Sequence, residues 1–114
     1  MAKTVIYYYL TARGDNPVRE FIVSLQKRQQ AKVRRVLESV TEYGLLSIIP
    51  HVKKLVGLPL WEIRILGTDN IRIIYMVKIK DAIYVLHGFV KKTQKTPEHE
   101  IALALKRYKE ILAS

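Results

Sequence analysis

Four segments of the chain alternate hydrophobic and polar positions in the manner of β-strands. They are residues 3–10, 60–66, 70–79 and 82–89, and each is rich in β-branched or aromatic residues. The turn signals Gly67-Thr68-Asp69 and Lys80-Asp81 separate the last three segments by only a few residues. We therefore expect an N-terminal strand and, later in the chain, an antiparallel meander.

Two segments after the first strand repeat apolar residues at helical spacing instead. Asn16 and Pro17 mark the start of the first helix as N-cap and first helical residue, and Gly44 ends the second as a left-handed cap. The apolar positions of this predicted two-helix hairpin are Val18, Phe21, Ile22, Leu25, Val33, Val36, Leu37, Val40 and Tyr43.

The rest of the chain predicts a loop and a last helix. Residues 45–59 contain two prolines and a glycine, which favour a loop with a short strand near Val52–Val56. Thr96 is the predicted cap of the last helix and Pro97 its first residue. The apolar stripe of this helix consists of Ile101, Leu105, Tyr108 and Leu112.

The predicted order is an N-terminal strand, a two-helix hairpin, an antiparallel β-meander and a C-terminal helix. Because strands and helices form separate runs, this order is typical of an α+β fold. The chain has 114 residues, of which 49% are hydrophobic and 26% charged. This length and composition suit one globular domain over residues 1–114.

Charge and cysteine usage narrow the possible functions. The 20 Lys and Arg residues outnumber the 10 Asp and Glu residues, for a net charge of +10. Such an imbalance indicates a polyanionic partner, or an acidic protein that covers the charge. The absence of cysteine excludes disulfides and thiolate metal sites, and no apolar run is long enough for a membrane span. Because the N-terminus also lacks a signal-peptide pattern, we expect a cytoplasmic protein with no membrane partner.

Strand alternation gathers basic residues on one face of the meander. Trp61, Ile63 and Ile65 point to the core, so Glu62 and Arg64 point to the other face. The cations that we expect around this face are Arg64, Arg72, Lys53, Lys54, Lys91, Lys92 and Lys95. The plainer alternative is that the two arginines are exposed strand residues paired with nearby carboxylates, which contributes only about 0–1 kcal/mol per pair.

A concentrated positive field suits the phosphates of RNA, because Arg offers a planar fork of donors and Lys a compact charge. Cleavage of RNA through its own 2′-hydroxyl requires in-line positioning, a proton acceptor and cations that stabilise the charge developing on the phosphate. No metal or other cofactor is required. The sequence has no carboxylate cluster and no His-x-x-x-His spacing that would hold a metal.

Three stretches resemble the phage-derived HigB-like branch of the RelE toxin superfamily. They are Leu60-Trp61-Glu62-Ile63-Arg64-Ile65, Ile71-Arg72-Ile73-Ile74-Tyr75 and Leu86-His87-Gly88-Phe89-Val90-Lys91-Lys92-Thr93-Gln94-Lys95-Thr96-Pro97, followed by Glu100-Ile101 and Ala104. The order of elements is similar over nearly the whole chain, and the specific part covers residues 53–104.

The resemblance implies a type II toxin, an endoribonuclease that cleaves messenger RNA on the ribosome and inhibits translation. It also implies a cognate antitoxin, commonly with a helix-turn-helix domain. By position, Arg64 matches the basic residue of the first meander strand, Arg72 the arginine of the next strand, and Lys91 or Lys92 the basic residue at the exit of the last strand. Wider RNA contacts are expected from Lys53, Lys54 and Lys95.

Glu62 and His99 are the candidates for proton transfer, and both depart from the family pattern. Glu62 stands where RelE has a second basic residue, and it acts either as a general base or as a partner that orients Arg64. No tyrosine stands where RelE has one in its C-terminal segment, and His99 is the titratable residue nearest to that place. We interpret His87 as structural, and the aromatic residues Trp61, Tyr75 and Tyr84 as core residues.

Two other functions fit the same fold. ParE-like relatives poison DNA gyrase by protein contact and lack the basic catalytic set, so Arg64, Arg72 and Lys91-Lys92 argue against that class. A non-catalytic RNA- or ribosome-binding relative stays open, because the proton-transfer residue is not identified. The sequence also leaves open the codon preference and the docking surface of the antitoxin.

Overall fold

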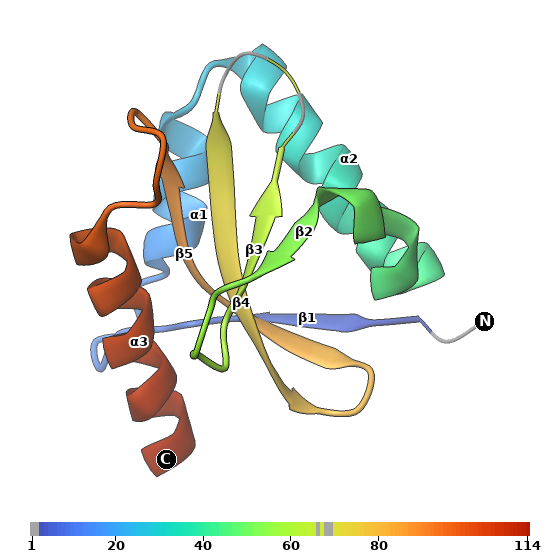
Figure 1. The fold of residues 1–114 in the computed structure, drawn as a ribbon. Coiled ribbons are helices and arrows are strands. Elements are labelled where there is room, and N and C mark those ends of the chain that lie inside the picture. Colours follow the sequence, from blue (N-terminus) through green and yellow to red (C-terminus); the bar gives the residue numbers. More distant parts are fainter. Residues whose placement is uncertain (1–2, 66, 68–69) are drawn as a thin grey trace.

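A five-stranded β-sheet forms the centre of the protein. In the computed structural model, which describes residues 3–65, 67 and 70–114, the strands stand in the order β1-β5-β4-β3-β2 (Figure 1). Their bounds are β1 Val5–Tyr8, β2 Val52–Lys54, β3 Trp61–Arg64, β4 Ile71–Ile79 and β5 Ala82–Val90. β1 runs parallel to β5, and the other neighbouring strands are antiparallel. The predicted N-terminal strand and antiparallel meander are confirmed.

Helices cover both faces of this sheet. α1 (Pro17–Ser24) and α2 (Lys27–Tyr43) pack on one face, and α3 (Glu98–Ala113) packs on the other (Figure 1). A 3-10 helix, η1 (Leu45–His51), connects α2 to β2. The arrangement confirms the predicted α+β class. Within the described ranges, no helix combines the length and the apolar character that crossing a bilayer requires.

Alternation along β4 explains why the sheet has a core on each side. Ile71, Ile73 and Tyr75 pack toward α1 and α2, whereas Ile74 and Met76 pack toward α3. All five side chains are buried. A strand that contributes to two cores must be apolar nearly throughout, as this one is until it leaves the covered part of the sheet at Val77.

The sheet face that carries Glu62 is also buried, although the strand pattern assigned it to an open basic face. Trp61, Ile63 and Ile65 face the α1–α2 core, as predicted. On the opposite face Leu60 is fully buried and Glu62 is 1% exposed. The reason is that α3 and the segment leading into it cover this face.

Several predicted strands are shorter in the structure. The N-terminal strand covers only Val5–Tyr8, because these four residues pair with β5. β2 and β3 end before the predicted limits of 52–56 and 60–66. The loop expected before β2 is the 3-10 helix η1. The predicted turn at Thr68-Asp69 lies outside the described residues.

The predicted start of α3 is wrong at Thr96. Pro97 occupies the N-cap position without a side-chain cap, and the helix begins at Glu98. The Thr96 hydroxyl instead donates to Glu62. Tyr43 and Leu112, expected in the apolar stripes of their helices, are exposed at the helix ends, because helical periodicity continues beyond the surface that each helix covers.

A β-bulge in β5 changes which side chains face α3. Ile74 pairs with His87 and Tyr75 pairs with Val85, so Leu86 is an extra residue in β5. Leu86 packs in the core under α3, and His87 contacts α3 directly. The bulge thus turns two consecutive side chains toward the same helix.

Polar contacts fix α3 in place. The Nε2–H of His87 donates to Oε1 of Glu100 at 2.7 Å, and Nη1 of Arg107 lies 3.4 Å from Nδ1 of His87. The Tyr9 hydroxyl donates to Glu110 at 2.9 Å. An imidazole that donates from Nε2 and accepts at Nδ1 is neutral. Burial lowers the pKa of His87, although the bond to Glu100 opposes this shift. These contacts confirm that His87 has a structural role.

We expect Gly88→Ala to destabilise the protein by about 1–3 kcal/mol, because the added Cβ overpacks the α1–β5 contact. This Cβ would lie 2.6 Å from Cδ2 of Phe21 and 3.2 Å from Cδ1 of Ile73. Urea unfolding measures the change. In a Phe21→Leu background, which makes room, Gly88→Ala should be less costly; an equal cost in both backgrounds would contradict the steric account.

We expect the thermal midpoint of the wild type to fall more between about pH 7.5 and about pH 5.5 than that of His87→Gln. A lowered pKa in the folded state means that the unfolded chain binds more protons in this range. The stability that the neutral His87 contributes is therefore fully present above the ordinary histidine pKa, and it decreases on acidification below that pKa. His99→Gln, at a side chain that is 79% exposed, is the control and should behave like the wild type. Parallel pH profiles for the wild type and His87→Gln would contradict a lowered pKa of His87 in the folded protein.

Candidate functional site

Arg64 and Arg72 lie side by side on the face of the sheet that α3 partly covers. They are directly opposed in the register of β3 and β4. Opposed residues of antiparallel strands share a face, with Cα atoms about 4.5–5.5 Å apart. Like charges in this arrangement are destabilising unless an anion or a carboxylate compensates them. The expectation that both arginines lie on one face of the sheet is confirmed.

A cavity of about 490 Å³ opens beside Arg72, where β4 starts and β5 ends. Its lining residues are Asn70, Arg72, Lys91, Lys92, Thr93 and Gln94. The backbone N–H of Lys91 donates to the carbonyl of Asn70 at 2.7 Å, which fixes the exit of β5 against the start of β4. Three cations therefore line one small concave surface, and Arg64 adjoins it across the sheet.

The Glu62 carboxylate lies beneath this surface, where it contacts Thr96 and Arg72. Oε2 accepts a hydrogen bond from the Thr96 hydroxyl at 2.6 Å. Oε1 lies 3.4 Å from Nε of Arg72, as an ion pair without the alignment of a hydrogen bond. Nη1 of Arg72 donates to the carbonyl of Ile71 at 3.2 Å. Glu62 thus contacts Arg72, whereas the sequence left a contact with Arg64 as one of its roles.

The structure distributes the other predicted lysines over different surfaces. Lys53 is directly opposed to Glu62 and so shares its face, but Lys54 is opposed to Trp61 on the face of α2. Nζ of Lys54 lies 5.9 Å from the centre of the Trp61 ring and donates to the carbonyl of Leu58 at 2.8 Å. Lys54 is therefore not brought to Arg72.

Lys95 and His99 lie outside the lining of the cavity. The carbonyl of Lys95 accepts from the Thr93 hydroxyl at 2.5 Å, so Lys95 belongs to the loop that carries Lys91 and Lys92. The His99 side chain is exposed, and its Nε2 lies 3.6 Å from Glu100. His99 thus stands on the first turn of α3 and faces solvent.

The aromatic residues considered for base stacking are packed in the cores. Trp61 and Tyr75 stack at 6.5 Å between ring centres on the α1–α2 side of the sheet. Burial raises the pKa of Tyr75 to about 12, so its hydroxyl stays protonated at neutral pH. Tyr84 stacks on Tyr7 at 5.0 Å. The expectation that these three aromatics serve the core is confirmed.

Sequence reasoning missed Asn70, Thr93, Gln94 and the contact of Thr96. Asn70 has a positive φ of 55°, which asparagine tolerates better than most residues, and this conformation starts β4 beside the cavity. Thr93 and Gln94 gave little indication that they line a site, because polar side chains among lysines are common at protein surfaces. The contact between Thr96 and Glu62 could not be expected from the sequence, because the two residues are 34 positions apart.

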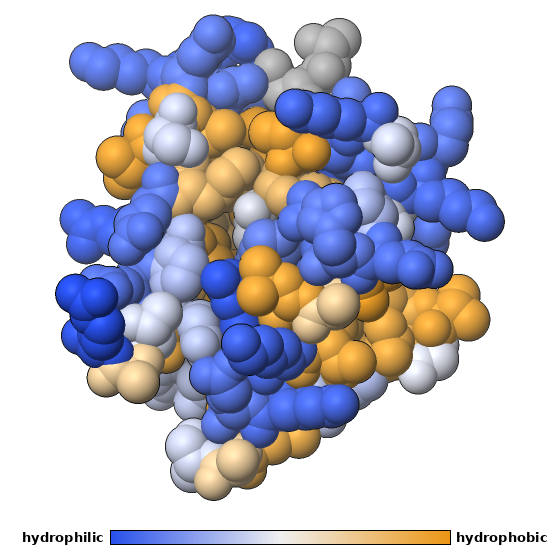
Figure 2. Space-filling view, turned by 90° about the vertical axis from the view of Figure 1, so that its left-hand side faces the viewer, coloured by the Kyte–Doolittle hydropathy of each residue, from blue (hydrophilic) through white to orange (hydrophobic). Residues whose placement is uncertain are grey.

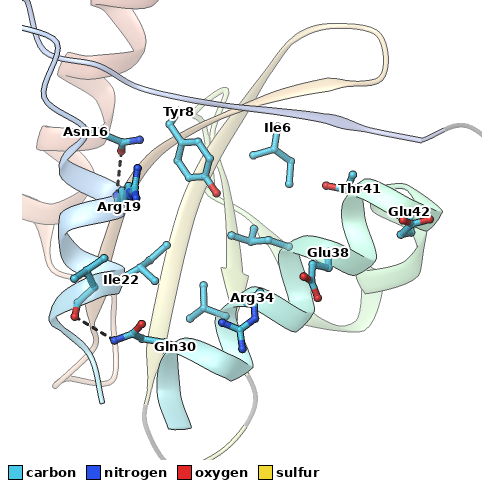
Figure 3. Close-up of a pocket in the computed structure, with 13 residues that line it drawn as sticks. Ile6, Tyr8, Asn16, Arg19, Ile22, Gln30, Arg34, Glu38, Thr41 and Glu42 are labelled. Atoms are coloured by element: carbon cyan, nitrogen blue, oxygen red, sulfur yellow. Dashed lines mark hydrogen bonds between the residues drawn. The ribbon is translucent and has the colours of Figure 1, made fainter. Parts of the chain in front are cut away.

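A larger groove of about 920 Å³ lies on the opposite side of the sheet, between β1, α1 and α2 (Figure 3). Ile6 and Tyr8 of β1 point into it, toward the two helices (Figure 3). Its charged lining residues are of both signs: Arg19, Arg34, Glu38 and Glu42. This groove is the larger of the two, but among the described residues only the smaller cavity concentrates cations without a carboxylate in its lining, which suits a phosphate better.

The surface on the side of α3 is mainly hydrophilic, with hydrophobic groups exposed between the polar ones (Figure 2). Among the described residues, no group of three or more His, Cys, Asp and Glu is placed to hold a metal ion. The arrangement around Arg72 can bind a phosphate, orient it through a planar guanidinium and stabilise additional negative charge on it.

Comparison with known proteins identifies a family whose model covers most of the chain. Residues 20–109 match the family described as Phage derived protein Gp49-like (DUF891). This range contains α2, the sheet strands from β2 to β5, the basic cavity and most of α3. No curated protein matches the chain. Because the match spans most of the 114 residues, the protein belongs to the phage-derived Gp49-like family, which is related to the RelE/HigB-like toxins of toxin–antitoxin systems.

Proposed function

We propose that this protein is a HigB-like toxin that cleaves messenger RNA on the ribosome and thereby inhibits translation. The observation that carries the proposal is the cavity lined by Arg72, Lys91 and Lys92, with Arg64 beside it. Such a cluster fits the phosphodiester groups of RNA, which is the polyanion that a ribonuclease must hold. Membership of a toxin-related family supports the same conclusion.

In this proposal the 2′-hydroxyl oxygen of the RNA attacks the adjacent phosphorus, and the bond from phosphorus to the 5′-oxygen breaks. Arg72 and Arg64 stabilise the negative charge that develops on the non-bridging oxygens. Each such preorganised donor contributes roughly 100- to 1,000-fold to the rate in comparable oxyanion sites. The products are a 2′,3′-cyclic phosphate and a free 5′-hydroxyl.

Proton transfer is assigned by position in the cavity. The ammonium of Lys91 or Lys92 protonates the departing 5′-oxygen, because both residues line the cavity. The 2′-hydroxyl proton passes to water. Glu62 is assigned to hold Arg72 rather than to accept this proton, since its oxygens already face Thr96 and Arg72. His99 is not assigned a chemical step, because it lies on the exposed side of α3.

The proposed partners follow from the same charge distribution. Lys53 and Lys95 extend the basic surface toward a longer stretch of RNA, while Lys54 points to the other face. A cognate antitoxin, of the helix-turn-helix type that the HigB resemblance implies, neutralises the toxin. Its acidic residues would compensate part of the net charge of +10.

We expect Arg72→Lys to lower kcat about 100-fold for cleavage of ribosome-bound messenger RNA, because a lysine cannot supply the planar fork. Lysine is preferable to alanine, since alanine would leave the buried Glu62 carboxylate without its cation. Single-turnover cleavage on purified ribosomes measures the change. Circular dichroism verifies that the variant is folded.

Arg35→Lys, the same substitution on the exposed side of α2, is the matched control and should cleave like the wild type. A folded Arg72→Lys protein with wild-type cleavage would overturn the assigned role. Growth arrest with intact messages and broken DNA would replace ribonuclease activity with gyrase poisoning.

We expect RNA affinity to fall as salt rises, and Lys92→Ala to reduce the slope of log affinity against log salt by about 0.7, the value for one contact to a single-stranded phosphate. Fluorescence anisotropy with a short single-stranded RNA between about 50 and about 200 mM salt measures this slope. Lys109→Ala, an exposed lysine of α3, is the control. An unchanged slope for Lys92→Ala would place the phosphate contacts elsewhere.

A further inference from the structure

Thr96 carries a hydroxyl that neither caps α3 nor faces solvent. The residue is half-buried, and its Oγ1 donates to Oε2 of Glu62 at 2.6 Å. A hydrogen bond of this length to a carboxylate is a strong, charge-assisted one. Because Glu62 is 1% exposed, water cannot readily replace the donor. The loss of this hydroxyl would therefore leave a buried carboxylate oxygen without its partner.

The same carboxylate reaches Arg72 through its other oxygen. Oε1 lies 3.4 Å from Nε of Arg72, and no better acceptor for this nitrogen exists in the part of the chain that the structure describes. Glu62 is thus a bridge with one end at Thr96 and the other at a guanidinium that lines the cavity. A rotation of the carboxylate would release both contacts together.

Thr96 is also the last residue of the segment 91–96, which carries Lys91, Lys92 and Lys95 and is called the basic loop below. At the start of this loop the Lys91 N–H donates to Asn70 at 2.7 Å, and at its end the Thr96 hydroxyl is bound to β3 through Glu62. The intervening residues 92–95 are exposed. Two anchors therefore determine how the loop passes over the cavity, and one of them also holds Arg72.

We infer that Thr96 is a positioning residue. Its hydrogen bond to Glu62 fixes the carboxylate that contacts the guanidinium of Arg72, and the same hydrogen bond fixes the end of the basic loop. The catalytic part of this inference rests on the proposed ribonuclease function. Thr96 itself contacts no RNA. It acts by holding two cationic elements at a constant separation, and misplacement of such groups by about 1 Å lowers rates by roughly 100-fold in comparable sites.

The test compares Thr96→Val, which keeps the shape and removes the hydroxyl, with Thr96→Ser, which keeps the hydroxyl. We expect Thr96→Val to lower kcat for ribosome-bound messenger RNA by about 10- to 100-fold with a smaller change in KM, and Thr96→Ser to restore most of it. Thr41→Val, at an exposed residue of α2 that lines the groove on the other face of the sheet, is the matched control and should be unaffected. Thr96→Ala replaces Thr96→Val if the valine variant is unfolded.

A double-mutant cycle separates positioning from general stability. If Thr96 acts through Glu62, Thr96→Val should add almost nothing to the loss in a Glu62→Gln background, whereas independent effects would multiply. Fully multiplicative losses in kcat, or equal activity of Thr96→Val and the wild type, would overturn the inference.

Nuclear magnetic resonance of the arginine side chains provides a readout that needs no RNA. The Nε–H resonance of Arg72 should be sharp and protected from exchange in the wild type and in Thr96→Ser, and broadened or shifted in Thr96→Val. An unchanged resonance in Thr96→Val would reject positioning by Thr96. If the wild type cleaves no RNA, the proposed function fails, while this resonance still decides whether Thr96 positions Arg72.

Discussion

The carboxylate of Glu62 is 1% exposed, and the arrangement of the basic site depends on how this charge is accommodated. An ionised carboxylate removed from water is destabilising by several kcal/mol unless cations and hydrogen-bond donors replace its hydration. Arg72 supplies the cation and Thr96 the donor. These residues come from β4 and from the segment before α3, so one charge links three parts of the chain. The position of the site follows from this requirement.

Buried ion pairs are weak sources of stability, and well-packed apolar residues often replace them without loss. We therefore interpret Glu62 as a residue that holds Arg72 in one orientation rather than as one that stabilises the fold. The fold has other sources of stability in its two cores, one on each face of the sheet. α3 has its own polar anchors at His87 and Tyr9, which keep the helix in place independently of the carboxylate. The basic loop is thus attached to a helix that is already fixed.

Much of the site followed from local patterns. Period-two alternation assigned Trp61 and Ile63 to one face and Arg64 to the other, and the short connection to the next strand brought Arg72 to the same face. The position of Lys54 could not be predicted in this way. The sheet face on which Lys54 lies depends on the register between β2 and β3, and alternation within either strand does not specify that register. The prediction of Thr96 as the helix cap was wrong for a related reason: its hydroxyl donates to the buried carboxylate of Glu62, which is distant in the sequence.

The sequence by itself determined the α+β class, the order of the elements, the excess of cations and the placement of Arg64 on the sheet face opposite Trp61 and Ile63. These properties depend on residues that are close in the chain, or on totals over the chain. Only the tertiary structure decided that α3 covers the face with Glu62, that Arg72 and Thr96 share its carboxylate, and that Lys91 and Lys92 meet Arg72 across a small cavity. Such contacts join elements that are distant in sequence, and they depend on packing and on the strong tendency of buried charges to find partners.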